Sequence, residues 1–404
     1  MRNMHSDQGN AIKEKKRFSI ISFGYLNATG SGGGFISWHL ANAFMKNGLL
    51  DDVIVFTKGK EMLPFPCKEA IPYLKYYLFL RSCIKRVVNV PYYLLRGFDE
   101  RLCDFFCRRF IRGDATIYVF THPVFPRTAK LLKKKGVPVV LITPNPFDIF
   151  IEEIVLEEMR KNTINGTDAY TSRFRLKDMK KYWPEIDYII SLSSVVTDTY
   201  DKYGFGNKII TLNNPLGLNF EYFENKIEKK DKVFRVCYLA HSVLLKGLQY
   251  LLEAWSNIRS VNTELIIGGS MDNNVRHIID RKYKELKNVR YIGNVEDVKS
   301  FYSQGTIFIC PSLIDAYPRT VFEAMAFGLP VIVTEGCGAK DIIDDGEEGF
   351  IIPQGNADAI REKITWFLEH PAETVTMGIK ANNKIRKYPV EKFANEITEI
   401  LSNL

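Results

Sequence analysis

The sequence lacks a long apolar run and an apolar leader. No stretch approaches the roughly 18 apolar residues that a membrane-spanning helix needs. The polar residues 1–17 lack the apolar core of a signal peptide. We therefore expect a cytoplasmic protein, and we read the sequons at Asn27 and Asn165 as chance matches rather than glycosylation sites.

Cysteine is also sparse, with seven in the chain and no C-x-x-C pair. Cys103 and Cys107 would share one face of a helix, but no histidine or further cysteine joins them at a metal-ligand spacing. This usage is typical of reduced thiols in an intracellular protein.

The charge balance is only mildly basic. A net charge of +8 and a pI near 8.9 suit an anionic lipid surface, a nucleotide substrate or nucleic acid, and decide between none of them. A length of 404 residues with 46% hydrophobic and 25% charged composition indicates a globular chain of two or three domains.

Short apolar runs alternate with helical patterns along most of the chain. Strands are expected at residues 18–23, 53–57, 116–121, 137–143 and 188–193, and again at 234–239, 264–268, 289–292, 306–310, 331–334 and 349–352. This alternation predicts an α/β protein of two doubly wound, Rossmann-like domains that face each other across a cleft.

The boundaries follow from where the pattern stops and restarts. We expect a disordered tail at 1–16, a first domain at 17–212, a linker at 213–230 and a second domain at 231–388. A last helix at 389–404, after Pro389, could cross back to the first domain.

A glycine-rich stretch at 29–35 follows the first strand, and a helix is expected at 36–45. Glycines at this point let backbone N–H groups approach an anion closely. The spacing is not G-x-G-x-x-G, so a ligand-binding loop and a plain tight turn both remain open.

Residues 73–112 interrupt the alternation with aromatic and basic helical segments. That composition suits a helix lying in a membrane interface, with cations directed toward anionic head groups. It equally suits a helical pair that packs on the sheet and leaves a basic face in water. Nucleic acid is a third option, but no recognised binding module supports it.

The stretch at 311–338 joins two expected strands through a helix that begins near Pro318 and ends at Gly328. Asp315 lies in the loop before this helix and Glu323 lies just inside it. The N–H groups of the first helical turn would point between these two acids, which is a suitable seat for a phosphate.

Four blocks resemble the retaining, nucleotide-sugar-dependent glycosyltransferases of family 4, which have the GT-B fold. They are RVCYLAHSVLLKGLQYLLEAW at 235–255, ELIIGG at 264–269, VRYIGNV at 289–295, and the stretch 311–353, in which Asp315 and Glu323 occupy the E-x7-E signature. The first half resembles the family more weakly, through the glycine-rich loop, residues 156–160 and the linker. The pattern is most similar to members that build glycolipids or surface polysaccharides.

The resemblance implies roles in donor binding and catalysis. Lys246, with the amides of Thr320 and Val321, would neutralise the leaving diphosphate. Glu323 would accept hydrogen bonds from the ribose hydroxyls, and Asp315 would hold hydroxyls of the transferred sugar.

Backbone groups would complete the donor site. The Ala316 and Tyr317 amides would assist at the sugar, and the turn through Gly293 and Val295 would contact the base. In the first domain, Gly33 would face the diphosphate and His122 would lie beside the reacting sugar carbon. The family needs no divalent metal and no D-x-D motif is present, so we expect neither metal nor other cofactor.

Two departures from the family pattern bear on activity. Asp315 is one methylene shorter than the usual glutamate, and Ala316 replaces a common glycine. Where the family usually has an arginine before Lys246, this chain offers only His241 and Leu245, so a cation beside the diphosphate is lost unless Lys340 replaces it.

We therefore expect a retaining transferase that moves a hexose from a UDP- or GDP-sugar to a lipid-linked or cell-surface glycan, peripheral on the inner face of the membrane and without a nucleic-acid partner. The alternative is a catalytically silent GT-B protein that binds nucleotide or glycan. An epimerase on the same fold is disfavoured, because its acid and base residues are not recognisable.

Overall fold

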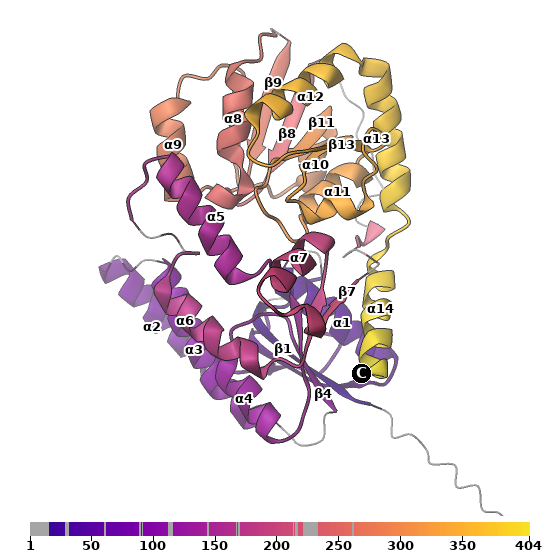
Figure 1. The fold of residues 1–404 in the computed structure, drawn as a ribbon. Coiled ribbons are helices and arrows are strands. Elements are labelled where there is room, and N and C mark those ends of the chain that lie inside the picture. Colours follow the sequence, from indigo (N-terminus) through magenta and orange to yellow (C-terminus); the bar gives the residue numbers. More distant parts are fainter. Residues whose placement is uncertain are drawn as a thin grey trace, which may run out of the picture.

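The computed structural model describes residues 16–404 except 29–31, 60–61, 89, 91, 112–115, 144, 167, 169, 213, 215–216, 221–232 and 261. The expected tail therefore lies almost wholly outside the described residues, and so does most of the expected linker. The described chain forms two fully parallel sheets, each flanked by helices (Figure 1). Among the described residues, no helix is both long enough and apolar enough to cross a membrane.

The first sheet has seven strands in the order β3-β2-β1-β4-β5-β6-β7. Its strands are β1 (Phe18–Tyr25), β2 (Leu50–Thr57), β3 (Lys68–Glu69), β4 (Ile117–Phe120), β5 (Val139–Thr143), β6 (Tyr188–Ser191) and β7 (Ile209–Thr211). Its helices are α1 (Gly32–Lys46), α2 (Leu74–Val87), α3 (Tyr92–Cys107), α4 (Pro126–Lys134), α5 (Asp148–Lys161), α6 (Arg173–Tyr182) and α7 (Ser194–Lys202). The central strands are apolar and buried along their whole length, as a parallel sheet covered on both faces requires.

The second sheet has six strands in the order β10-β9-β8-β11-β12-β13. Its strands are β8 (Phe234–Leu239), β9 (Thr263–Gly268), β10 (Val289–Gly293), β11 (Ile307–Cys310), β12 (Val331–Thr334) and β13 (Gly349–Ile352). Its helices are α8 (Leu248–Ser256), α9 (Asn273–Lys282), α10 (Val298–Gln304), α11 (Arg319–Ala326), α12 (Ala357–Glu369) and α13 (Pro371–Ile385). Two short 3-10 turns, η5 (Leu244–Lys246) and η6 (Gly338–Ile342), follow β8 and β12.

The first helix begins four residues earlier than the sequence pattern predicts. Gly32, Gly33 and Gly34, expected to lie in a loop before residue 36, instead form the first turn of α1. A side chain at Gly34 would come within 2.1 Å of the Tyr25 carbonyl oxygen, so only glycine lets the helix start this close to the end of β1.

The last helix, α14 (Val390–Asn403), leaves the second domain and packs beside α1 of the first (Figure 1). The crossing is fastened at Leu218, whose backbone exchanges hydrogen bonds with Tyr388 and Val390. Further along, Glu396 accepts from both the amide and the side chain of Asn214, at 2.9 and 2.7 Å. Two separate passages of the chain therefore join the domains at this side.

Candidate active site

The first sheet reverses its winding direction between β1 and β4, and two predicted site residues follow these strands. Gly33 lies in the first turn of α1, after β1, and His122 lies two residues after the end of β4. A Cβ at Gly33 would come within 2.1 Å of His122 Cε1, so backbone and imidazole are in contact. The crevice at such a reversal is where open α/β sheets bind ligands.

The second sheet reverses between β8 and β11, and the same rule places the other predicted pair there. Lys246 ends η5, after β8, and Asp315 lies in the loop after β11. Lys246 Nζ lies 2.5 Å from Asp315 Oδ2, and the side chains are only 28% and 12% exposed. Burial disfavours the charged lysine, but the Asp315 carboxylate outweighs this and raises the pKa of Lys246 above its ordinary value.

Glu323 is held on α11 by two partners. Arg319 Nε lies 3.1 Å from one carboxylate oxygen, and the Tyr302 hydroxyl donates to the other at 3.0 Å. Burial raises the pKa of Glu323 above its ordinary value, although both partners oppose the shift. The sequence reasoning found Glu323 but missed Arg319 and Tyr302. Arginine four residues before glutamate on one helix is a signal that could have found the first of them.

The carboxyl ends of the two sheets meet, and α11 makes part of the contact. The Arg319 guanidinium lies 4.1 Å from the centre of the Phe35 ring, in the first turns of α1. After β6, the Ser193 hydroxyl donates to the Ala316 carbonyl at 2.7 Å. A side chain at Gly338 would collide with both Ser193 and Ala316. The loop that carries Asp315 is thus fixed partly by the first domain.

One predicted phosphate donor needs correction. The Val321 amide donates to the Pro318 carbonyl at 3.0 Å, which closes the first turn of α11. Because that N–H is already used inside the helix, only the Thr320 amide of the predicted pair stays a candidate for a phosphate. Tyr317 is buried beside Phe322, with 4.4 Å between ring centres, so any part it plays at the sugar falls to its backbone.

The expected base-contacting turn lies at the ends of β9 and β10. Gly293 has φ near 75° and its carbonyl accepts from the Gly269 amide at 2.6 Å. Val295 packs so closely on Gly268 that an added Cβ there would lie 2.7 Å from it. His241 is exposed, with Nδ1 2.7 Å from the Ser270 hydroxyl.

A cavity of about 1250 Å³ lies between the domains, on the acceptor side expected from the sequence. Its wall includes Pro123 and Val124, which directly follow His122, together with His241 and Val243 from the second domain. One face of α3 forms another wall. Lys246, Asp315 and Glu323 do not line it, so the cavity and the ion-paired cluster are adjacent but distinct spaces.

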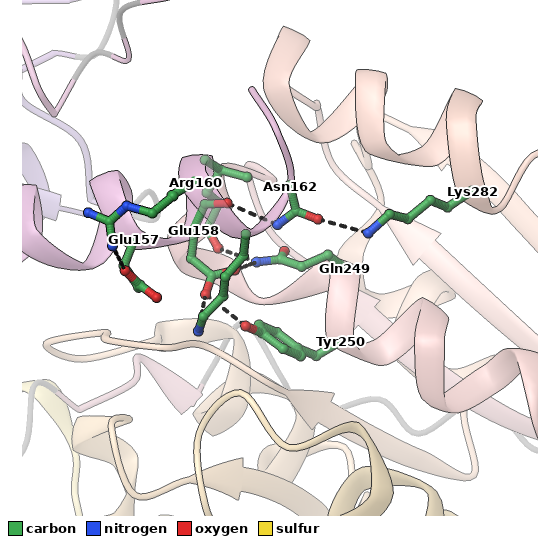
Figure 2. Close-up of polar contacts among 9 residues, drawn as sticks. Glu157, Glu158, Arg160, Asn162, Gln249, Tyr250 and Lys282 are labelled. Atoms are coloured by element: carbon green, nitrogen blue, oxygen red, sulfur yellow. Dashed lines mark hydrogen bonds and ion pairs between the residues drawn. The ribbon is translucent and has the colours of Figure 1, made fainter. Parts of the chain in front are cut away.

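Helix α5 belongs to the first domain by sequence but packs against the second (Figure 2). The side chain of Glu158 is 3% exposed and is the centre of this contact. Its carboxylate accepts from Gln249 at 3.0 Å and from the Tyr250 hydroxyl at 2.7 Å, both on α8. Gln249 also donates to the Leu244 carbonyl at 3.0 Å, so α5 supports the turn that carries Lys246.

Comparison with known proteins agrees with this geometry. Residues 219–388 match the family model described as glycosyl transferases group 1. The match covers the second domain and the end of the linker. An uncharacterized glycosyltransferase from Haemophilus influenzae is 27% identical to this chain over 222 residues, which are 53% of this chain and 61% of that protein. The capsular polysaccharide biosynthesis glycosyltransferase CapM of Staphylococcus aureus is 30% identical over 206 residues, 47% of this chain and 53% of CapM.

Solved structures extend the likeness to the whole chain. Sucrose-phosphate synthase from Thermosynechococcus elongatus has a TM-score of 0.70 at 15% identity, with coverage of 96% of this chain and 99% of that one. HepE from Anabaena, solved in complex with UDP-glucose, has a TM-score of 0.63 at 14% identity, with coverage of 96% and 100%. At these identities the likeness establishes the fold alone: the chain has the expected GT-B architecture of two Rossmann-like domains.

Proposed function

We propose that this protein is a retaining glycosyltransferase that moves a hexose from a UDP- or GDP-sugar to a lipid-linked or cell-surface glycan acceptor. The observation that carries this proposal is the pair Lys246 and Asp315 at one sheet reversal, opposite Gly33 and His122 at the other. The group 1 match supports the reaction class. The capsular assignment of CapM supports a polysaccharide acceptor, and the UDP-glucose complex of HepE supports a nucleotide-sugar donor.

The leaving diphosphate makes the largest chemical demand. Negative charge builds on its oxygens as the bond to the sugar breaks, and Lys246 is the cation placed to stabilise it. On binding, the diphosphate would replace Asp315 as the ion-pair partner of the Lys246 ammonium, and Asp315 would turn toward sugar hydroxyls. The acceptor hydroxyl then attacks the anomeric carbon from the face that the diphosphate leaves, and its proton passes to the departing phosphate oxygen.

The ribose would be held by Glu323. An ionised carboxylate accepts hydrogen bonds from two hydroxyls at once, and Arg319 keeps this carboxylate beside a cation. Because burial raises the pKa of Glu323, donor affinity should weaken as the pH falls toward that value.

We place this reaction in the cytoplasm. The seven cysteines include no C-x-x-C pair, and this usage is typical of reduced thiols in an intracellular protein. We further propose that turnover needs no divalent metal, so that excess chelator should leave the rate unchanged.

A thermal-shift screen of UDP-, GDP- and ADP-sugars tests donor binding. We expect one class to raise the melting temperature, and Glu323→Ala to remove the shift. Absence of any shift, together with an unaltered Glu323→Ala variant, would refute the assignment. Donor hydrolysis with and without acceptor separates the transferase from a silent GT-B protein, because any turnover that Lys246→Ala abolishes excludes silence.

A further inference from the structure

Helix α2 packs Leu74 and Leu78 on the core but carries a second apolar stripe that faces solvent. Tyr76, Phe79, Leu80, Ile84 and Val87 recur at helical spacing and so share one face. All are exposed, with fractions from 44% at Ile84 to 85% at Val87. A surface helix normally buries this stripe, and an exposed patch of this kind marks an interaction site.

The neighbouring helix α3 continues the patch. Leu94, Phe98 and Phe105 recur at the same spacing and are 44%, 57% and 50% exposed. The rings of Tyr77 and Phe98 stack with 6.4 Å between their centres, which joins the two helices. Figure 1 shows α2 and α3 together at the outer edge of the first domain. We call these outward-facing apolar residues of α2 and α3 the apolar face.

The exposed charges described within residues 71–111 have one sign. Every acid between residues 71 and 111 is buried: Asp99, Glu100 and Asp104 are 5%, 6% and 2% exposed. The first two are ion-paired inside the domain, to Arg81 at 3.0 Å and Arg96 at 2.9 Å.

Three cations of the same segment are exposed: Lys75 and Arg86 on α2, and Arg109 just after α3. An apolar stripe flanked by cations, with the acids turned inward, is complementary to an anionic lipid surface and unlike the mixed charge of an ordinary solvated face.

The apolar face also adjoins the interdomain cavity. Gly97, Glu100 and Arg101 of α3 line that cavity, while Phe98 on the same helix points to solvent. One helix therefore borders both the cavity and the exposed patch, so an acceptor anchored in a surface beneath the patch would have its head group next to the cavity.

We propose that the apolar face binds membranes that contain anionic lipid, and that it thereby presents a lipid-anchored acceptor to the interdomain cavity. The second half of this inference rests on the proposed transferase function, whereas the first half does not.

Vesicle co-sedimentation of the full chain tests the proposal. The probes are vesicles of phosphatidylcholine alone and vesicles in which one third of the lipid is phosphatidylglycerol. We expect binding to the anionic vesicles that weakens between about 0.05 M and about 0.5 M salt, as the Debye length falls from more than about 10 Å to less than about 5 Å. No sedimentation with either vesicle at low salt would overturn the proposal.

Matched double variants locate the surface. Leu80→Ser with Ile84→Ser should weaken vesicle binding at least about tenfold, because two apolar side chains no longer leave water. The control is Val375→Ser with Ile379→Ser, which removes two exposed apolar residues at the same spacing from α13 and should change binding less than about twofold. Equal losses in the two variants would contradict the assignment to α2.

Two further readouts separate the remaining outcomes. Lys75→Gln with Arg86→Gln should reduce binding to anionic vesicles to the level seen with phosphatidylcholine. Light scattering that shows a dimer lost in the Leu80/Ile84 variant, without vesicle binding by the native chain, would assign the face to a second copy instead. The Leu80/Ile84 variant should hydrolyse donor in vesicle-free buffer at the native rate. If neither the native chain nor any variant hydrolyses donor, the transferase proposal is refuted, and the proposal of membrane binding still stands.

Discussion

Removal of the Glu158 carboxylate should weaken the attachment of α5 to the second domain. In Glu158→Ala the Tyr250 hydroxyl and the Gln249 amide each lose an ionised acceptor, at 2.7 and 3.0 Å (Figure 2). Lys161 loses its partner too, but it is 53% exposed and can return to water.

The expected size follows from these contacts. A hydrogen bond to a charged group contributes about 1.5–3 kcal/mol. Gln249 keeps its bond to Leu244, so its loss is partial, whereas the Tyr250 hydroxyl must find water at a domain contact. We expect the free energy of unfolding to fall by about 3 kcal/mol, from one full and one partial loss of such a bond.

Glu157→Ala is the matched control, because it removes the preceding carboxylate from the same helix. Glu157 pairs with Arg160 at the surface, where the side chains are 47% and 75% exposed. Such a pair contributes about 0–1 kcal/mol. Urea titrations followed by tryptophan fluorescence should therefore separate the two variants clearly, and the transition that moves should be the one reporting Trp255 on α8.

Two outcomes would refute the reasoning. If the free energies of unfolding of Glu158→Ala and Glu157→Ala differ by less than about 1 kcal/mol, Glu158 does not hold α5 on the second domain. If Glu158→Ala unfolds early but donor hydrolysis in native buffer is unchanged, α5 does not support the turn that carries Lys246. Glu158→Gln, which keeps the volume and one acceptor oxygen, should fall between Glu158→Ala and the native protein.

Two further variants test the site, and one at His39 on α1 tests the pH dependence of stability. Lys246→Met should lower kcat/KM about 10²–10³-fold through lost stabilisation of the leaving group. Lys246→Arg should recover part of this loss. A Lys246→Met variant as fast as the native protein would exclude this role for Lys246. Glu323→Gln should weaken donor binding about ten- to hundredfold, the effect of losing charged hydrogen bonds. It should also lower the stability of the unbound protein, because the buried Arg319 loses its ion-pair partner. Burial lowers the pKa of His39 from 6.5 to about 4, so the unfolded chain takes up the proton first and up to about 3 kcal/mol of stability is lost as the pH falls from 6.5 toward 4. His39→Gln should flatten that slope in urea titrations across this pH range, and an unaltered slope would contradict it.

The fold was predictable where local patterning decides it. Buried parallel strands read as short apolar runs, and their alternation with helices implies parallel sheets. What local patterning could not supply was the start of α1 in the glycine stretch, because that start depends on how closely Gly34 approaches Tyr25 after folding. Helices α6, α7, α9, α10 and α13 were not anticipated either, since polar or short amphipathic segments carry weak periodicity.

The candidate site divides in the same way. Lys246, Asp315 and His122 could be proposed from sequence because the surrounding blocks resemble the family 4 motifs, and each lies in the segment after a recognisable strand, where a parallel sheet gathers its ligand-binding loops. Ser193 and Glu158 could not, because their partners lie in the other domain, 123 and 91 residues away in the chain. Their roles arise only when the two domains pack together.

The ion pair between Lys246 and Asp315 is the contact that donor binding must change. The loop around Asp315 is held by backbone bonds to Gly336 and Gly338 and by the Ser193 contact to Ala316, so it is fixed before any ligand arrives. A rigid loop means that the reorganisation falls on the two side chains.

A diphosphate can displace Asp315 from Lys246 only by offering stronger charge–charge contact, because a ligand shifts an equilibrium by no more than its differential affinity for the two arrangements. Asp315→Asn removes that competition. It should therefore tighten binding of the nucleoside diphosphate product while lowering turnover, and a variant that weakens both would show that Asp315 positions Lys246 rather than competing for it.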